Sequence, residues 1–383
     1  MRIGVDIRAL LDRPLTGVGE YTFQLLDALL RDGHDDTYVL FSNSFHDRPV
    51  LPDAWPRDRF TLRTFRIPNK LLNLSLVLAR RPRLDRMLAP IDCFFAPNLH
   101  FLPLTRETPF LLTVHDLSFH HYRSLFSLRR RLWHRLLMPE RLFARADVLL
   151  AVSQATADDL HKTYHIPNEK IAMIHSGIHI VRTSEDAQAR VRTQYRLPEH
   201  FLLSLSTLEP RKNLLAVLDA YEQLRARFGY RGGLVIAGAP GWSRGAFHRA
   251  LATHPYRADI QVLPYVAPEE KYALFALADV FLYLSVYEGF GFPPLEAAMQ
   301  GTPVLAGHHS SLSEVMDDAA ILVDVHNIAD IAHGVAAVLH DAPLRSRLAA
   351  AGARVSARYS WKKTAALTRA AFYASRGSHA HRH

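Results

Sequence analysis

One stretch, residues 279–300, constrains the fold more than any other part of this chain. Residues 279–285 are apolar and aromatic enough for a buried strand of a parallel sheet, and residues 295–300 have high helix propensity. The loop between them contains the run Tyr-Glu-Gly-Phe-Gly-Phe-Pro-Pro. Its two prolines suit the first turn of a helix, where an N–H group would have no partner. The stretch therefore predicts a strand, a glycine loop and a helix N-terminus in succession.

Such a junction suits a ligand that carries phosphate. The N–H groups and the positive end of a helix favour an anion, and Gly289 and Gly291 let the backbone approach it. Glu288 lies on the loop at the carboxyl end of the strand, where open α/β sheets bind ligands. Glu296 lies within the first turns of the helix. We expect one carboxylate to hold a sugar hydroxyl and the other to hold a ribose.

Both halves of the chain alternate between strand and helix. Strands are expected at residues 3–7, 38–42, 92–96, 110–115, 148–153, 171–175, 201–206, 234–238, 260–266, 279–285, 303–306 and 320–323. Helices are expected at residues 19–31, 155–163, 214–228, 269–278, 294–300 and 328–340. This alternation predicts an α/β protein with two mostly parallel, doubly wound sheets. The more polar residues 176–200 are expected to connect them.

The spacing of Glu288 and Glu296, with Gly-Phe-Gly-Phe-Pro-Pro-Leu between them, resembles the E-x7-E signature of a known family. These are the retaining, nucleotide-sugar-dependent glycosyltransferases of the GT-B fold, family four. The resemblance implies two Rossmann-like domains whose parallel sheets face a central cleft. Residues 1–180 would form the N-terminal, acceptor-side domain and residues 181–359 the nucleotide-sugar domain, with a helix at 360–376 packing back on the first. The alternative is an ordinary strand–turn–helix junction with two capping acids.

Two adjacent cations, Arg211 and Lys212, follow the first strand of the second half. Opposite a helix N-terminus, such a pair can clamp a diphosphate as charge builds on it during transfer. Residues 206–213 are similar to the family's G-T-x-x-P-R-K-N, with Ser206 where glycine is usual. The resemblance implies that Arg211, Lys212 and Glu288 are catalytic. The alternative is a solvated, charged start of a helix.

The first half contributes a glycine pair and a histidine. Gly17 and Gly19 open the first long helix, but Thr22 stands where a dinucleotide-binding fingerprint needs its third glycine. The resemblance implies that this loop faces the donor phosphate and the acceptor; the alternative is a helix start without a ligand. His115, at the end of a strand and before Asp116, resembles the family's active-site histidine, which contacts the donor sugar. Its alternative role is structural.

The remaining donor contacts are also implied by the resemblance. Tyr265 and Val266 are similar to the segment that borders the nucleobase, largely through its backbone. The full donor-binding set is Gly17, Gly19, Ser206, Tyr265, Val266, Gly289, Phe290, Gly291, Leu295 and Glu296. No Asp-x-Asp metal motif occurs in the sequence, so we expect a metal-independent site without a cofactor.

The net charge of +9 calls for a polyanionic partner or an anionic surface. The sequence has no zinc-finger spacing or RNA-binding aromatic pattern, which argues against nucleic acid. Residues 63–88 and 122–145 are basic and apolar together. They predict either attachment to the anionic inner membrane or core helices with a solvated arginine face. The single cysteine, Cys93, fits a reducing compartment, and the chain opens on a strand pattern without a signal peptide, so a cytoplasmic location is expected.

The N-terminal pattern M-R-I-G-V-D-x-R-x-L, followed by T-G-V-G-E-Y, resembles bacterial mannosyltransferases of surface-polysaccharide assembly. It implies GDP-mannose as the donor and a hydroxyl of a glycan or lipid-linked saccharide as the acceptor. Three other functions stay open at this point. They are another nucleotide-sugar enzyme of the same architecture (an epimerase or phosphorylase), a nicotinamide oxidoreductase, and a basic nucleic-acid-binding protein.

Overall fold

The computed structural model describes residues 1–12, 15–179, 181–239, 241 and 244–380. The chain divides into two compact units: unit 1 comprises Met1–Gly177 and Tyr359–His383, and unit 2 comprises Ile178–Arg358. The domain boundary expected at residue 180 lies outside the described residues. Both units are α/β domains with a parallel sheet, so the expected fold class is confirmed.

Unit 1 contains a seven-stranded sheet with the order β3-β2-β1-β4-β5-β6-β7. Its strands are β1 (Arg2–Asp6), β2 (Thr37–Asn43), β3 (Phe60–Phe65), β4 (Cys93–Ala96), β5 (Phe110–Val114), β6 (Val148–Ala151) and β7 (Ile171–Met173). Its helices are α1 (Gly17–Arg31), α2 (Asn69–Leu78), α3 (Leu84–Leu88), α4 (Ser118–His121), α5 (Leu128–Leu137), α6 (Pro139–Arg145), α7 (Gln154–Tyr164) and α16 (Trp361–Ala380). All neighbouring strands pair in parallel.

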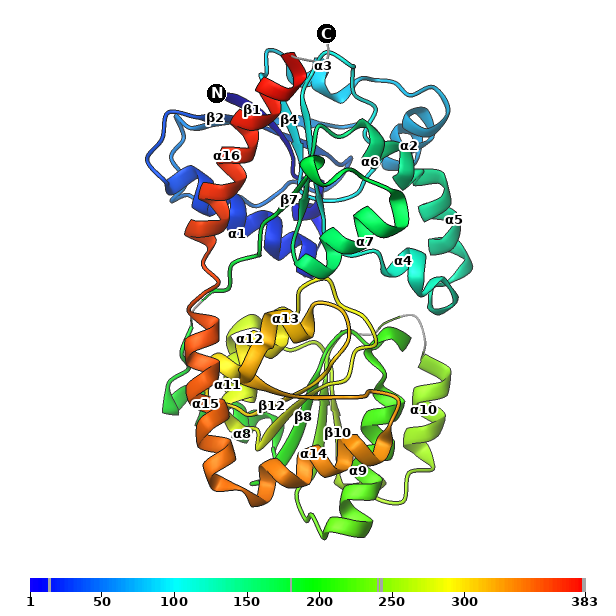
Figure 1. Cartoon of the computed structure of the whole chain (residues 1–383), viewed down its shortest axis with the longest axis vertical. Coiled ribbons are helices and arrows are strands. Elements are labelled where there is room, and N and C mark those ends of the chain that lie inside the picture. Colours follow the sequence, from blue (N-terminus) through cyan, green and yellow to red (C-terminus); the bar gives the residue numbers. More distant parts are fainter. Residues whose placement is uncertain (13–14, 180, 240, 242–243, 381–383) are drawn as a thin grey trace. The chain divides into compact units, whose positions relative to one another are not determined.

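The sheet of unit 1 is buried on both faces, as a parallel sheet requires. Helix α16 packs against α1 and against the strands at the centre of the sheet (Figure 1). Consecutive residues of β4 point to opposite faces: the Phe95 ring lies 5.3 Å from Phe372 of α16, and Phe94 belongs to the apolar cluster of the other face. The C-terminal helix therefore completes the core of the N-terminal domain.

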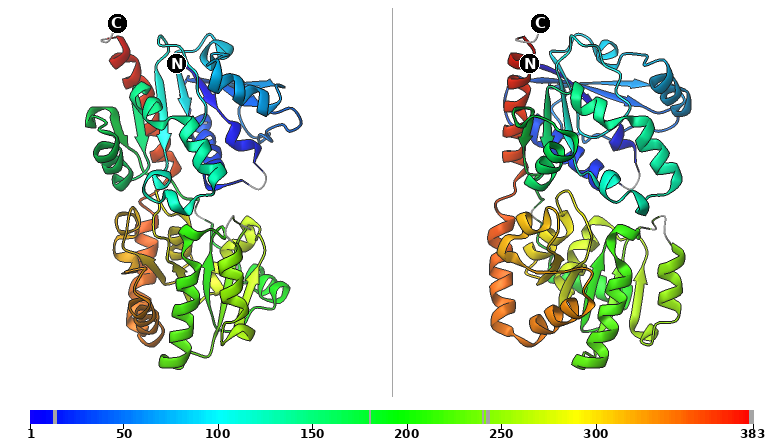
Figure 2. Two further views of the ribbon diagram at one scale, coloured as in Figure 1. Left: turned by 90° about the vertical axis from the view of Figure 1, so that its right-hand side faces the viewer. Right: turned by 45° about the vertical axis from the view of Figure 1, so that its right-hand side comes forward.

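Unit 2 contains a six-stranded sheet with the order β10-β9-β8-β11-β12-β13, again parallel throughout. Its strands are β8 (Phe201–Leu205), β9 (Gly233–Ala237), β10 (Ile260–Leu263), β11 (Val280–Tyr283), β12 (Val304–Gly307) and β13 (Ala320–Val323). Its helices are α8 (Glu185–Tyr195), α9 (Leu214–Phe228), α10 (Arg244–Ala252), α11 (Pro268–Leu277), α12 (Phe292–Met299), α13 (Leu312–Met316), α14 (Ile328–His340) and α15 (Ala342–Ser356). Helices α9, α10 and α14 pack together, as do α8, α11, α12 and α15, and Figure 2 shows helices on both sides of the sheet.

Every strand expected from the sequence is present, whereas strand β3 and helices α8, α10, α13 and α15 are among the elements that were not expected. Strand β3 lies at the edge of its sheet and is only partly buried, so its residues do not form an apolar run. Helix α8 lies in the stretch interpreted as a connection. It is polar, with Val191 as its buried residue, and begins where the Ser184 side chain accepts a hydrogen bond from Ala187.

The strand order of each sheet reverses at one point. In unit 1 the reversal lies between β1 and β4, and in unit 2 it lies between β8 and β11. Ligands of open α/β sheets bind at such a switch point, outside the carboxyl ends of the strands. The two switch points are therefore the places at which to look for sites.

Candidate active site at the switch point of unit 2

The switch point of unit 2 brings together three of the residues predicted to be catalytic. Strands β8 and β11 are parallel neighbours, so their carboxyl ends lie at the same edge of the sheet. A short 3-10 turn, Pro210–Lys212, follows β8 and carries Arg211 and Lys212. Glu288 lies on the loop that follows β11. The turn and the loop are joined directly, because the Val286 N–H donates to the Arg211 carbonyl at 3.0 Å.

These three side chains form a buried ion cluster. The two carboxylate oxygens of Glu288 bind different cations: Oε2 lies 2.9 Å from Arg211 Nη1, and Oε1 lies 2.5 Å from Lys212 Nζ. Arg211 also binds the Glu209 carboxylate at 2.9 Å, and Lys212 donates to the Tyr283 hydroxyl at 2.9 Å. Two carboxylates thus balance two cations, and both cations are held in place within the free protein.

The cluster fixes the charge state of Glu288. Burial opposes ionisation of this carboxyl, but attraction to Arg211 and Lys212 outweighs burial and lowers its pKa to about 2. Burial lowers the pKa of Lys212, although the charge of Glu288 opposes that shift. Glu288 is therefore a carboxylate at neutral pH, suited to accept a hydroxyl proton in a hydrogen bond rather than to donate one.

One glycine and two serines determine the conformation of the loop after β11. Gly291 has φ of 106° at the start of α12, and a Cβ there would lie 2.6 Å from Leu312 Cδ2. Ser310 Oγ accepts a hydrogen bond from the Glu288 N–H at 2.9 Å. Ser311 Oγ donates to the Glu288 carbonyl at 3.0 Å. These serines follow β12, and the sequence analysis did not identify them. Their position just after an expected strand is the one sequence signal that could have identified these serines.

Glu296 lies in the second turn of α12 and forms a separate ion pair. Its Oε1 is 2.7 Å from Lys271 Nζ of α11, and only 8% of the residue is exposed. The carboxylate predicted to hold a ribose is therefore occupied by a lysine in the free protein. Lys271 and Glu296 lie on different helices, α11 and α12, so no local sequence motif identifies Lys271 as the partner.

The other predicted donor contacts of unit 2 differ in accessibility. Ser206 directly follows β8, and its hydroxyl is buried without a hydrogen-bond partner among the described residues. Tyr265 is 45% exposed after β10, whereas Val266 is buried. Leu295 is fully buried, and its contact with the donor stays a prediction. Gly289 and Phe290 are buried as well.

In unit 1, His115 follows β5 and is held by its neighbours. Its Nε2 lies 2.8 Å from the Pro97 carbonyl and so carries the proton, because a carbonyl only accepts. The Tyr21 ring of α1 packs edge-on at 4.6 Å. Burial lowers the pKa of His115, so the imidazole is neutral at neutral pH. Asp116 accepts hydrogen bonds from the N–H and hydroxyl of Ser118 instead of binding the ring.

The two glycines at the start of α1 serve different purposes. A Cβ on Gly19 would lie 3.0 Å from the Ala9 carbonyl oxygen, so this residue is small because the chain packs closely there. Gly17 is exposed, and a Cβ on it would meet nothing within 4 Å. Space beside Gly17 is therefore open to a ligand, and contact with the donor stays a prediction for both glycines.

The described residues contain no group of three or more His, Cys, Asp or Glu side chains placed to hold a metal ion. In the same part of the chain, no helix is long and apolar enough to cross a bilayer.

Comparison with known families decides the identity of the chain. Residues 15–182 match the family model described as Glycosyltransferase Family 4, and residues 186–355 match that described as Glycosyl transferases group 1. The chain belongs to this glycosyltransferase family. The two matches are consecutive and together span nearly all of the enzyme, which confirms the resemblance seen in its motifs.

Relatives of this glycosyltransferase include mannosyltransferases. It is 30% identical over 231 residues to the serotype-specific mannosyltransferase WbdA of Escherichia coli, which covers 59% of this chain but only 28% of WbdA. It is 28% identical over 366 residues to the O-antigen chain mannosyltransferase B of Escherichia coli, covering 93% and 95% of the two chains. The Anabaena HepE structure with UDP and glucose superimposes with a TM-score of 0.73 at 16% identity, covering 98% and 100%. This structural likeness shows the GT-B fold.

Proposed function

We propose that the enzyme transfers mannose from GDP-mannose, with retention at the anomeric carbon, to a hydroxyl of a glycan or lipid-linked saccharide in bacterial surface-polysaccharide synthesis. One observation carries the proposal for the donor: Glu288 holds Arg211 and Lys212 together at the switch point of unit 2. The similarity to O-antigen chain mannosyltransferase B along nearly its whole length supports mannose as the sugar.

The ion cluster suits a leaving diphosphate. Transfer passes through a transition state like an oxocarbenium ion, in which negative charge grows on the departing phosphate. Preorganised cations in a buried site stabilise such developing charge without reorganising. Two of the three hydrogens of Lys212 Nζ bind Glu288 and Tyr283, which leaves one for a phosphate oxygen. In our proposal, Glu288 holds the cations in position and accepts a hydrogen bond from the donor sugar.

The other residues have supporting roles in this proposal. Glu296 binds the ribose, and Tyr265 and Val266 border the nucleobase. His115 contacts the donor sugar, and the departing phosphate accepts the proton of the acceptor hydroxyl. Because two cations take the place usually filled by a divalent ion, catalysis proceeds without a metal.

A nucleotide screen tests the choice of donor. GDP at 100 times its dissociation constant should raise the free energy of unfolding by about 2.7 kcal/mol. Thermal unfolding in matched concentrations of GDP, UDP and ADP measures the order of affinities. A larger stabilisation by UDP than by GDP would overturn GDP-mannose as the donor while leaving the glycosyltransferase assignment intact.

Metal removal has an expected null effect. After exhaustive treatment with EDTA and gel filtration into metal-free buffer, the rate of sugar transfer should stay unchanged, because Arg211 and Lys212 supply the positive charge. The assay is release of GDP from GDP-mannose before and after treatment. If activity disappears and returns with added Mg²⁺ or Mn²⁺, the site requires an ion that our proposal omits.

We also propose that unit 1 binds the anionic inner face of the cytoplasmic membrane. Leu128, Leu132 and Leu136 are spaced four residues apart on α5, and all three are exposed. They do not belong to the core, which argues against a core helix. Arg129, Arg130 and Arg135 are exposed on the same helix. Helix α2 also exposes three leucines, Leu71, Leu74 and Leu78.

Replacing Leu128 and Leu132 together by serine should weaken membrane binding at least about tenfold, because each leucine buried in the bilayer contributes about 1.5–3 kcal/mol. Co-sedimentation with phosphatidylglycerol vesicles measures the loss, and phosphatidylcholine vesicles should bind little of either protein. Leu215→Ser is the matched control, since Leu215 is exposed on α9 of unit 2. Equal sedimentation of the double variant and the wild type would contradict the proposal.

A further inference from the structure

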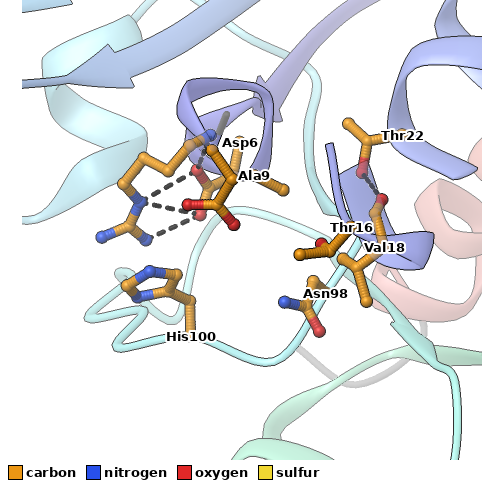
Figure 3. Close-up of a pocket in the computed structure, with 9 residues that line it drawn as sticks. Asp6, Ala9, Thr16, Val18, Thr22, Asn98 and His100 are labelled. Carbon is orange, nitrogen blue, oxygen red and sulfur yellow. Dashed lines mark hydrogen bonds and ion pairs between the residues drawn. The ribbon is translucent and has the colours of Figure 1, made fainter. Parts of the chain in front are cut away.

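The two sheets have cavities at opposite edges. In unit 1, a cavity of about 190 Å³ lies where β1 ends and α1 begins, at the carboxyl edge that binds ligands in open α/β sheets (Figure 3). In unit 2, a cavity of about 460 Å³ lies at the amino edge, where its lining includes His200, directly before β8, and Asp279, directly before β11. The proposed function uses the carboxyl edge of unit 2 and gives this second cavity no role.

The cavity of unit 2 is large enough for a small organic molecule. Its volume falls within the range of about 300–1,000 Å³ that is typical of ligand sites. The five residues of β8 span about 15 Å between this edge of the sheet and the carboxyl edge, where the ion cluster lies. A ligand in the cavity would therefore leave the nucleotide site free.

Part of the lining is apolar. Leu224 and Phe228 come from α9, and Leu339 comes from α14. Leu224 is buried, whereas Phe228 and Leu339 are half-buried. We call these three residues the apolar wall. An apolar group that covers the wall removes both surfaces from water, which favours binding.

The carboxylate of the lining, Asp279, is already bound within the protein. Its Oδ1 lies 3.1 Å from Nδ1 of His200, and its Oδ2 accepts a hydrogen bond from the Tyr230 hydroxyl at 3.2 Å. The hydrogen bond to Asp279 raises the pKa of His200, so protonation of the ring neutralises this carboxylate. The lining therefore offers little negative charge to a cationic ligand.

Two arginines of the lining, Arg231 and Arg345, have no carboxylate partner in the part of the chain that the structure describes. Arg345 donates through Nη1 to the carbonyls of Val338 and Leu339, at 2.9 Å and 2.7 Å, and so satisfies the last turn of α14. Arg231 is exposed and makes no hydrogen bond to any described residue. We call Arg231 and Arg345 the cavity arginines. Positive charge is thus in excess around the cavity.

The apolar wall and the cavity arginines together define the class of ligand. Arginine binds carboxylate and phosphate oxygens through charge-assisted hydrogen bonds. An inorganic anion would leave the apolar wall in water, and an uncharged apolar molecule would offer no acceptor to the arginines. We propose that this cavity binds an organic anion, with its charged head at the cavity arginines and its apolar body against the apolar wall. The site belongs to unit 2 alone and does not depend on which nucleotide sugar the enzyme uses.

The test uses octanoate as the probe, octanol as its uncharged analogue, and a titration followed by ligand-observed NMR. The variant Arg231→Gln removes one charge without breaking a hydrogen bond to the described residues. Arg347→Gln is the matched control, since Arg347 is exposed on α15 and lies outside the lining. We expect saturable binding of octanoate to the wild type and the control. Its affinity for Arg231→Gln, and that of octanol for the wild type, should be about tenfold lower.

Two further measurements test the apolar wall and the head group. Leu339→Ala removes part of the wall and should weaken the binding of octanoate severalfold. Octyl phosphate keeps the apolar body and changes the head, so it should also lose affinity for Arg231→Gln; its affinity relative to octanoate tells which head the cavity arginines prefer.

Addition of GDP separates this site from the nucleotide site. Octanoate should bind the wild type equally with and without saturating GDP, because the two ligands occupy opposite edges of the sheet. The proposal is overturned if GDP displaces octanoate, if octanol binds as tightly as octanoate, or if Arg231→Gln or Leu339→Ala binds octanoate as the wild type does. Titration of GDP alone tests the proposed donor, so a failure there would not affect the cavity.

Discussion

Replacing Arg211 or Lys212 by alanine is expected to lower turnover about a hundred- to a thousandfold. Both cations lie against Glu288 at the carboxyl edge of the sheet, where in our proposal the departing diphosphate gains charge. The attraction between these cations and the diphosphate grows stronger as the bond between sugar and phosphate breaks. The rate of turnover should therefore fall more than the affinity for the ground-state donor. Steady-state release of GDP from GDP-mannose, beside calorimetric binding of GDP, separates the two effects.

Two further variants make this prediction specific. Arg225→Ala removes another mostly buried cation of unit 2, one that pairs with Asp259 at 2.7 Å, and should leave turnover unchanged in the folded protein. His115→Ala should reduce transfer but keep the affinity for GDP, because His115 contacts only the sugar in our proposal. If His115→Ala loses nucleotide affinity while both cation variants turn over normally, the leaving-group clamp has been assigned to the wrong unit.

Glu296→Gln is expected to weaken GDP binding about ten- to a hundredfold, with or without the sugar. A hydrogen bond from a ribose hydroxyl to a carboxylate contributes roughly 1.5–3 kcal/mol, and glutamine removes its charge. Lys271→Met breaks the ion pair at 2.7 Å but keeps the carboxylate, so its effect on affinity should be smaller. Calorimetric titration of GDP into each protein measures the losses.

The control for the variants Glu296→Gln and Lys271→Met is Glu270→Gln. Glu270 is a partly buried carboxylate on α11 that accepts hydrogen bonds from Gln194 and Tyr195, so the substitution perturbs the same unit. Its affinity for GDP should match the wild type. Should Glu296→Gln bind GDP as tightly as Glu270→Gln does, the ribose is held by another group.

The alternation of apolar strands with amphipathic helices was sufficient to predict both sheets. Their buried strands are continuous apolar runs, and such runs are visible one element at a time. The edge strand β3 and the polar helix α8 lack that signal, because neither buries a full face. The sequence therefore predicted the strands at the centre of each sheet. It missed β3 and α8, and also helix α15, which buries Leu348 and Val355 and packs on α12.

The same limit applies to the candidate site. Arg211, Lys212 and Glu288 could be predicted because each lies just after an expected strand, within a run of residues typical of the family. The partners that hold them are distant in sequence: Ser310 supports the loop of Glu288, and Lys271 pairs with Glu296. Those contacts depend on tertiary packing.

The most direct test of the central claim follows the anomeric carbon during transfer. GDP-mannose, in which mannose is α-linked, is incubated with the enzyme and a mannose-terminated oligosaccharide, and the product is analysed by NMR and mass spectrometry. Our account predicts release of GDP and a product that is one hexose longer through a new α-mannosidic linkage. A β-linked product, or GDP-mannose left intact while a different nucleotide sugar is consumed, would contradict it.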